Sequence, residues 1–381
     1  MSTIQEVPDE ILVKIFSLIS IKDLCKVSQV SHRMRKISQD NCLWREIRIW
    51  AQVVPKKFMQ KMIKFEVQYL SLECCFIKPL PVELLKENNM NLKYLNISKC
   101  LGDDEFLANL VASSKSLECI NFGETRGSLV YKCIQNIPLQ NSITTINFTG
   151  MAKLVVENGP GWNKLTFASI KILIDNCQEL INVSFSNTIL SNESISYICK
   201  KLTNKALKIN FSGVKVRDED IDALAKNCTK LEYLNLTDTW VTLEAVPEIC
   251  RTWSKTLVDL SLPEEIGIVL GLHEKETIDH DLKIFASKIQ SMPNLQYLHI
   301  GDLRGNLNPM MKYKECITEE TSHREKLQRL FPNLGINMDP LFDPNYPGDL
   351  QWKFYLVDSN LKPAGLKFPR TQTNFWFFGV L

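Results

Sequence analysis

Twelve cysteines and five histidines are the residues of this chain best suited to covalent or metal chemistry. The histidines are scattered, and although His273 and His280 flank Asp279 and Asp281, we expect no metal site there. No glycine-rich phosphate loop, nucleophile elbow or H-E-x-x-H zinc motif occurs in the sequence. We therefore expect a protein that is not an enzyme and that holds no metal or other cofactor.

The cysteines indicate a reducing environment. No two of them form a C-x-x-C pair, and no nearby histidine completes a zinc-like set with Cys74 and Cys75. The N-terminus carries Glu6, Asp9 and Glu10 where a secretion signal needs an apolar segment. No run of about 18 apolar residues, the length of a membrane span, occurs either. These features predict an intracellular protein of the cytoplasm, the nucleus or both.

The charge of the chain argues against two classes of partner. It has 45 Lys and Arg against 43 Asp and Glu, a net charge of +2. Binding to nucleic acid needs clustered basic charge that displaces counterions, and binding to a membrane surface needs a polybasic run. We expect neither partner, so the chemistry left to the chain is recognition of other proteins.

A frame with apolar residues at its first, fourth and sixth positions recurs along the chain. Its period-two alternation predicts a strand, and the segments between frames have the polar starts and apolar spacing of helices. Most successive frames are 25 or 26 residues apart, which is typical of leucine-rich repeats. The frames begin at Val67, Leu92, Leu117, Ile143, Leu180, Ala206, Leu231, Leu257, Leu295 and, weakly, Phe331.

These repeats predict an α/β fold of the ribonuclease-inhibitor type. Stacked units place parallel strands on the inside and helices on the outside, and the wider helices curve the stack into a solenoid. We assign residues 67–338 to about ten repeats and residues 339–381 to a C-terminal tail. Three longer steps between frames leave insertions at Val155–Asn163, Pro263–Asp281 and Gly301–Glu320, which are candidate specificity loops.

The side chains between the apolar positions of each frame should form the binding surface of the sheet. They are small, polar and almost uncharged, with tyrosines at intervals. One interpretation is that asparagine and serine are habitual repeat residues; the other is a hydrogen-bonding floor for an extended peptide, with aromatic anchors. The candidate substrate-binding residues are Tyr94, Asn121, Asn147, Trp162, Asn210, Tyr233, Asn235, Tyr297, His299 and Trp376.

Residues 4–48 do not follow the repeat. Pro8 favours a helix start, and Asp9 and Glu10 suit its first turn. Apolar residues then recur at helical spacing in two short segments. The segment runs Val7-Pro-Asp-Glu-Ile-Leu, Ile15-Phe16, Asp23-Leu24, Val27-Ser28, Val30-Ser31 and Leu43-Trp44.

This pattern resembles an F-box, and it is similar to that of S-phase kinase-associated protein 2, in which an F-box also precedes leucine-rich repeats. The resemblance implies an all-helical F-box at residues 1–50 that binds the adaptor S-phase kinase-associated protein 1, followed by a linker helix at residues 51–66. The usual aromatic residue after the arginine is replaced by Met34. The implied adaptor-binding residues are Pro8, Ile11, Leu12, Ile15, Phe16, Asp23, Leu24, Lys26, Val27, Val30, Met34 and Trp44.

The resemblance implies a substrate-recognition subunit of an SCF-type (adaptor–cullin–F-box) ubiquitin ligase. The adaptor would connect it to a cullin–RING scaffold, and the repeats would bind a protein substrate, with or without an accessory subunit, for ubiquitination and proteasomal degradation. Two alternatives stay open. The chain could be an F-box scaffold outside a ligase, or a repeat inhibitor whose N-terminal helices merely cap the first repeat.

Overall fold

The computed structural model describes residues 4, 6–78, 85, 90–137, 142–151, 165–270, 280–300, 329–331 and 335–336. These residues fall into two compact units, Met1–Ile143 and Thr144–Lys362, and each is described by itself. Trp162, Trp376 and the predicted tail lie outside the described residues.

The first unit begins with three short helices and a 3-10 turn. Ser20 and Ser31 cap the second and third helices, since their side chains accept hydrogen bonds from the backbone N–H groups of Asp23 and Met34, each at 3.1 Å. Pro8 precedes the first helix and needs no N–H there. The elements are α1 (Asp9–Phe16), α2 (Ile21–Val27), α3 (His32–Ser38) and η1 (Asn41–Trp44).

Repeat units follow directly. A parallel sheet runs in the order β1-β3-β5-β7, and a small second parallel sheet has the order β2-β4-β6. Gly102 in β6 has φ +118°, and a Cβ there would lie 2.1 Å from the Ile77 carbonyl oxygen, so the close approach of β6 to β4 requires glycine. The elements are β1 (Glu46–Arg48), β2 (Val53–Val54), α4 (Lys56–Lys64), β3 (Tyr69–Ser71), β4 (Phe76–Ile77), β5 (Tyr94–Asn96), β6 (Leu101–Gly102), α6 (Asp104–Ser113), β7 (Cys119–Asn121) and α7 (Gly127–Gln135).

The segment expected as a linker at residues 51–66 contains β2 and α4. It lies between β1 and β3, which pair in parallel through Ile47 and Leu70. Repeat-type pairing therefore begins at Glu46, ahead of the first frame identified in the sequence.

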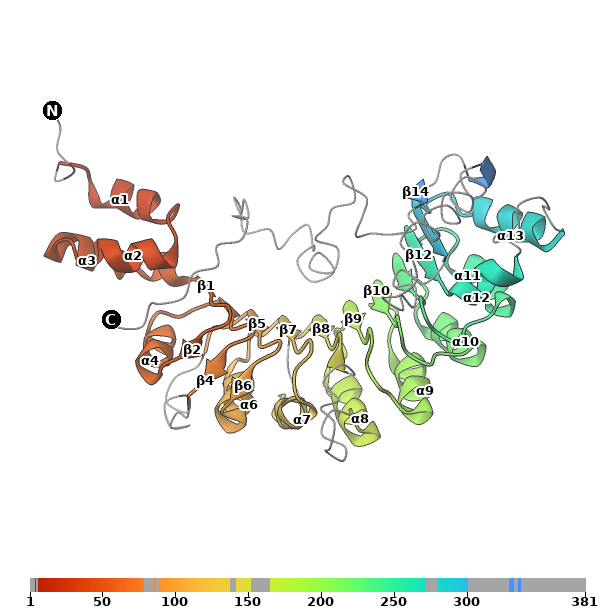
Figure 1. Ribbon diagram of the computed structural model, residues 1–381, viewed down its shortest axis with the longest axis horizontal. Helices are drawn as coiled ribbons and strands as arrows, with labels where there is room; N and C mark the ends of the chain where they lie inside the picture. The colour runs from red at the N-terminus through yellow and green to blue at the C-terminus, as the bar shows by residue number, and fades with distance from the viewer. Residues whose placement is uncertain are drawn as a thin grey trace, which may run out of the picture. The chain divides into compact units, whose positions relative to one another are not determined.

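The second unit repeats the same strand–helix alternation, with strands ordered β8 to β14 in sequence. Paired strands are parallel and in register, as at Asn210 and Asn235. Figure 1 shows the helices α8, α9 and α10 on one side of the strands of this unit. The elements are β8 (Thr145–Asn147), α8 (Phe167–Asn176), β9 (Asn182–Ser184), α9 (Asn192–Lys201), β10 (Lys208–Asn210), α10 (Asp218–Asn227), β11 (Tyr233–Asn235), η3 (Leu243–Ala245), α11 (Val246–Trp253), β12 (Asp259–Leu262), α12 (Glu264–Val269), α13 (His280–Gln290), β13 (Tyr297–Ile300) and β14 (Gly335–Ile336).

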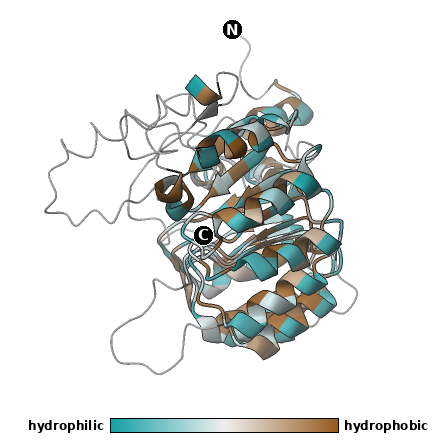
Figure 2. Cartoon of the chain, turned by 90° about the vertical axis from the view of Figure 1, so that its right-hand side faces the viewer, coloured by the Kyte–Doolittle hydropathy of each residue, from teal (hydrophilic) through white to brown (hydrophobic). Residues whose placement is uncertain are grey.

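The core consists of the apolar positions of the frames. Every apolar residue of the frames that begin at Val67 to Leu295 is buried, so the predicted repeats and the α/β fold are confirmed. In the core of the second unit, Phe148, Phe185 and Phe211 come from successive repeats and stack on one another, with ring centroids 5.4 and 6.0 Å apart. In Figure 2 the helices carry hydrophobic and hydrophilic residues on the same ribbon, as amphipathic helices covering a sheet must.

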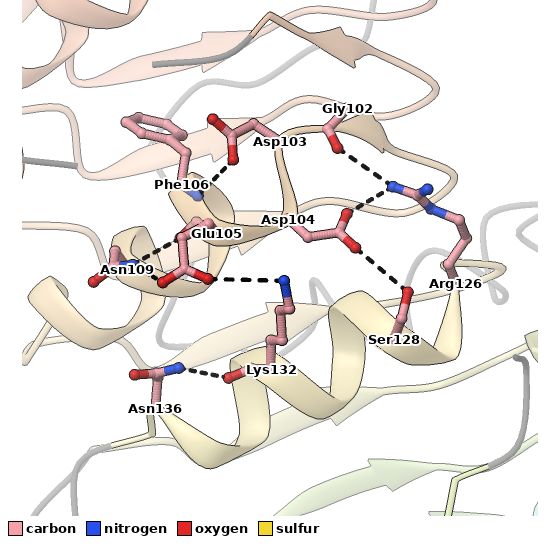
Figure 3. A network of polar contacts seen from close by, with 10 residues as sticks. All are labelled: Gly102, Asp103, Asp104, Glu105, Phe106, Asn109, Arg126, Ser128, Lys132 and Asn136. Atoms are coloured by element: carbon pink, nitrogen blue, oxygen red, sulfur yellow. Dashed lines mark hydrogen bonds and ion pairs between the residues drawn. The ribbon is translucent and has the colours of Figure 1, made fainter. Parts of the chain in front are cut away.

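Adjacent helices of the first unit are joined by a polar network (Figure 3). Arg126, which precedes α7, reaches back to α6, where its Nη2 lies 2.6 Å from Asp104 Oδ1 and 3.5 Å from the Gly102 carbonyl. Ser128 donates to the other Asp104 oxygen at 3.4 Å, and Lys132 lies 3.7 Å from Glu105. These contacts fix one repeat on the next at their outer edge.

No helix in the described part of the chain is long and apolar enough to cross a membrane.

Candidate functional site

The N-terminal helices have a small core of their own. Five of the residues predicted to bind the adaptor are buried in it: Leu12, Phe16, Leu24, Met34 and Trp44. Trp44 stacks on Phe65 at 4.8 Å and donates its Nε1–H to the Ser38 carbonyl at 2.7 Å. These buried side chains hold the helices together. They would influence adaptor binding indirectly, by keeping the N-terminal helices in place.

Polar contacts fix the helices relative to one another. The Arg33 guanidinium, in α3, lies 2.6 Å from Asp9 Oδ1 at the start of α1 and also donates to the Val7 carbonyl. Asp23 and Lys26 form an exposed ion pair at 2.8 Å on α2. This pair lies at the surface, where a partner can reach both charges.

A second set of apolar side chains in the same module points to solvent. Ile11 and Ile15, both predicted, are 44% and 46% exposed, and Leu18 is 85% exposed; the spacing places them on one side of α1 and its C-terminal turn. Val30, between α2 and α3, is 75% exposed, and Ile4 is 60% exposed. Clustered exposed aliphatic side chains are typical of interaction surfaces.

Leu18 and Ile4 were missed by the sequence interpretation. Leu18 continues the spacing of Ile11 and Ile15 by one further turn, which was a readable signal. Of the other predicted residues, Pro8 is exposed and Val27 is half-buried. The structure therefore separates the predicted set into a core and a surface.

In each unit, the candidate substrate-binding residues that the structure describes lie on the strands, on the face opposite the helices. Tyr94 and Tyr233 are half-buried, and Tyr297 is 39% exposed. His299 is buried, with its Nε2 3.4 Å from Asp259 Oδ1 on the neighbouring strand. The tyrosines are the members of this set most available to a ligand.

The asparagines of this face have an internal hydrogen-bonding role. In each case the side-chain oxygen accepts a hydrogen bond from the backbone N–H two residues later, which closes the turn after the strand. The distances are 2.8 Å for Asn121, 2.6 Å for Asn147, 3.0 Å for Asn210 and 2.9 Å for Asn235. Their role in the turn supports the interpretation that they are habitual repeat residues.

The next turn position has left-handed backbone geometry. Glu124, Gly213 and Asp238, each three residues after such an asparagine, have φ of 51°, 72° and 54°. At Gly213 a Cβ would lie 2.7 Å from Asn187 Oδ1, so this position also favours glycine on steric grounds. The asparagine hydrogen bond thus stabilises a backbone shape that few residues adopt freely.

Two exposed tryptophans were also missed. Trp50 follows β1 and is 59% exposed, and Trp240 follows β11 and is 50% exposed. The three-position frame does not include either residue, and its periodicity gives no indication of exposure at these loop sites. Large exposed aromatic residues are common at the centre of protein interfaces.

Most of the thiols are unsuited to chemistry. Burial raises the pKa of the Cys75 and Cys250 thiols to about 11 and those of Cys119 and Cys228 to about 12. Among the described residues, no group of three or more His, Cys, Asp or Glu side chains is placed to hold a metal ion.

Comparison with known proteins identifies the N-terminal module. Residues 4–50 match the F-box-like family model. F-box/LRR-repeat protein 12 of Homo sapiens is 31% identical over 64 residues, which cover 17% of this chain and 20% of that protein. The Mus musculus protein of the same name is 30% identical over 64 residues, with the same two coverages. The match spans about a fifth of the length of these relatives. The N-terminal helices are an F-box, and the chain is an F-box protein with leucine-rich repeats.

Similar solved structures include the yeast Rad7–Elc1 complex and an internalin from Listeria monocytogenes. The first is 15% identical, with a TM-score of 0.40, over 89% of this chain and 90% of that chain. The second is 12% identical, with a TM-score of 0.38, over 74% of this chain and 89% of that chain. Both likenesses are low, and the repeat fold rests on the strand pairing of the chain itself.

Proposed function

We propose that this chain is the substrate-recognition subunit of an SCF-type ubiquitin ligase. The observation that carries the proposal is the exposed apolar set of the F-box, Ile11, Ile15, Leu18 and Val30, within the family match at residues 4–50. Such a surface is costly in water and is stabilised by a partner that covers it. The partner proposed is S-phase kinase-associated protein 1, because adaptor binding is the general property of an F-box.

The proposed arrangement divides the work between the two parts of the chain. The F-box would attach the chain to the adaptor and through it to the cullin–RING scaffold, while the repeats would hold a protein substrate. Ubiquitin transfer would take place on other subunits, and this chain would contribute by raising the effective concentration of substrate lysines near the charged ubiquitin carrier. The proposal implies an intracellular location.

The repeats favour protein recognition over small-molecule binding. Their sheet face is an extended surface with tyrosines, and the ends of the strands lead into loops on a rigid scaffold. Asn121 and Asn147 are almost fully buried and closed by turn hydrogen bonds, so we assign substrate contact to Tyr94, Tyr233 and Tyr297.

The experiment compares the turnover of bound proteins in cells. The wild-type chain and Ile15→Glu/Leu18→Glu, which places two charges on the F-box surface, are expressed in turn, and the proteins that both chains capture are followed by pulse–chase. The proposal predicts longer half-lives and less ubiquitin on those proteins in cells with the variant. Equal half-lives with both chains would instead support an F-box scaffold outside a ligase.

A further inference from the structure

The loops that follow three successive strands of the second unit form one exposed row. In each loop a solvent-facing residue stands between two buried ones. Backbone hydrogen bonds set the loops side by side: the Asn187 N–H donates to the Ser212 carbonyl at 2.7 Å, and the Trp240 N–H donates to the Val216 carbonyl at 3.0 Å. The three outward residues are Ile189, Lys215 and Trp240. With Arg217, two positions beyond Lys215, they form what we call the Trp240 cluster.

Two cations of this cluster lie over one indole ring. Lys215 Nζ is 4.9 Å and Arg217 Cζ is 5.2 Å from the centre of the Trp240 ring. A cation on an aromatic face is held in place without using its N–H donors, which stay available to a ligand. Trp240 is 50% exposed, so the ring is partly open to a ligand as well.

Two acidic side chains at the start of α10, close to Arg217 in the sequence, accept hydrogen bonds from other groups. Asp218 accepts hydrogen bonds from the backbone N–H and the hydroxyl of Thr242, at 2.8 and 2.7 Å. Asp220 accepts from the backbone N–H of Arg217 at 3.1 Å. Among the described residues, neither Lys215 nor Arg217 forms an ion pair with a carboxylate. Asp220 attracts Arg217 electrostatically without forming an ion pair with it. Both cations therefore keep N–H donors for an anionic group from outside.

We propose that the Trp240 cluster binds an acidic segment of the protein substrate. An anionic group, phosphate or carboxylate, would lie between Lys215 and Arg217, and neighbouring apolar side chains of the segment would cover Trp240 and Ile189. The inference rests on the proposed function, since the segment belongs to a substrate of the ligase. A protein segment fits better than nucleic acid because the row includes an aliphatic residue and the chain has a net charge of only +2.

The test measures binding of fluorescein-labelled peptides to the full-length chain by fluorescence anisotropy. The peptides share one leucine-containing sequence and differ only at the central residue, which is phosphoserine, glutamate or lysine. We expect the two acidic peptides to bind and the lysine peptide not to bind. Lys215→Glu/Arg217→Glu should weaken binding at least about tenfold, and Trp240→Ala about tenfold.

The matched control is Lys230→Glu/Lys255→Glu, which makes the same charge change at two exposed lysines of the same unit. It should leave the peptide affinity unchanged. Equal binding of both acidic peptides would show that the cluster accepts a carboxylate as well as a phosphate, and much tighter binding of the phosphoserine peptide would show a preference for phosphate.

Three results would overturn the inference: no binding of either acidic peptide, an equal loss in the control variant, or tighter binding of a labelled oligothymidylate. Adaptor binding by each variant is measured in parallel. A failure of the peptide site with intact adaptor binding, or the reverse, therefore tells the two proposals apart.

Discussion

The side chain of Asn235 connects the turn after β11 to the strand itself. Its Oδ1 accepts the Thr237 N–H at 2.9 Å, and its Nδ2 lies 3.3 Å from the Tyr233 hydroxyl. Asn235→Ala should lower the free energy of unfolding by about 1 kcal/mol, because the turn N–H loses its acceptor. Asn235→Asp keeps the acceptor and should recover most of the loss in chemical denaturation. Equal stability of all three chains would contradict a role in the turn and return Asn235 to the candidate substrate contacts.

The thiol of Cys42 is exposed at the end of the F-box but should react slowly. Partial burial and the neighbouring Asp40 carboxylate raise its pKa to about 11. At pH 7.5 its alkylation by iodoacetamide should be on the order of tenfold slower than that of an ordinary cysteine, and should accelerate as pH rises toward the pKa. Asp40→Asn removes the negative charge and should speed the reaction.

Mass spectrometry of the alkylated protein measures this rate together with that of Cys133, which is fully buried and should stay unmodified until the protein unfolds. An alkylation rate for Cys42 that is unaffected by Asp40→Asn would contradict the assignment.

At the scale of elements, the pair Arg126–Asp104 joins α7 to α6. The Asp104 side chain is 18% exposed, and its two oxygens contact Arg126 and Ser128 (Figure 3). Arg126→Ala should cost about 1 to 2 kcal/mol of unfolding free energy, since it leaves a largely buried carboxylate without its cation. The matched control is Lys205→Ala, which breaks the ion pair with Glu179, where both side chains are about half exposed; it should cost no more than about 0.5 kcal/mol. Similar losses in the two variants, measured by urea denaturation, would argue against a structural role for the network.

The sequence predicted the strand-forming part of each repeat because burial of the strand interior imposes a period of two. Leu70 and Leu72, or Leu234 and Leu236, can be read directly in this way. The first strand, β1, was missed although Trp44, Ile47 and Ile49 fit the same frame. The frame there overlaps the end of the F-box, whose own pattern had already accounted for Trp44.

The surface was harder to predict than the core. Burial sets a pattern of apolar residues, but exposure sets none, so Trp50 and Trp240 carried no periodic signal as interface residues. In the F-box, buried and exposed residues were predicted together as one binding set, because apolar residues recur at helical spacing on both faces of α1. The packing of α1 against α3 separates them: Phe16 is buried and Ile15 is exposed. Which apolar residues are core and which are contact surface depends on tertiary contacts between the helices.

For the molecule as a whole, the proposed function requires that the F-box surface bind an adaptor while the repeats remain folded and free to bind substrate. The central variant is therefore a pair of exposed residues, Ile15→Glu/Leu18→Glu, because truncating the buried Phe16 would also open a cavity in the module. The matched control, Leu101→Glu/Ile268→Glu, places the same two charges on exposed apolar residues outside the F-box, which are 50% and 56% exposed.

The most direct test is to co-express each chain with S-phase kinase-associated protein 1, purify by a tag on the adaptor and weigh the product by light scattering. We expect a one-to-one complex for the wild-type chain and for Leu101→Glu/Ile268→Glu, and recovery of the adaptor alone with Ile15→Glu/Leu18→Glu. Failure of the folded wild-type chain to bind the adaptor would contradict the proposed function, as would a complex that survives both charges on α1 and its C-terminal turn.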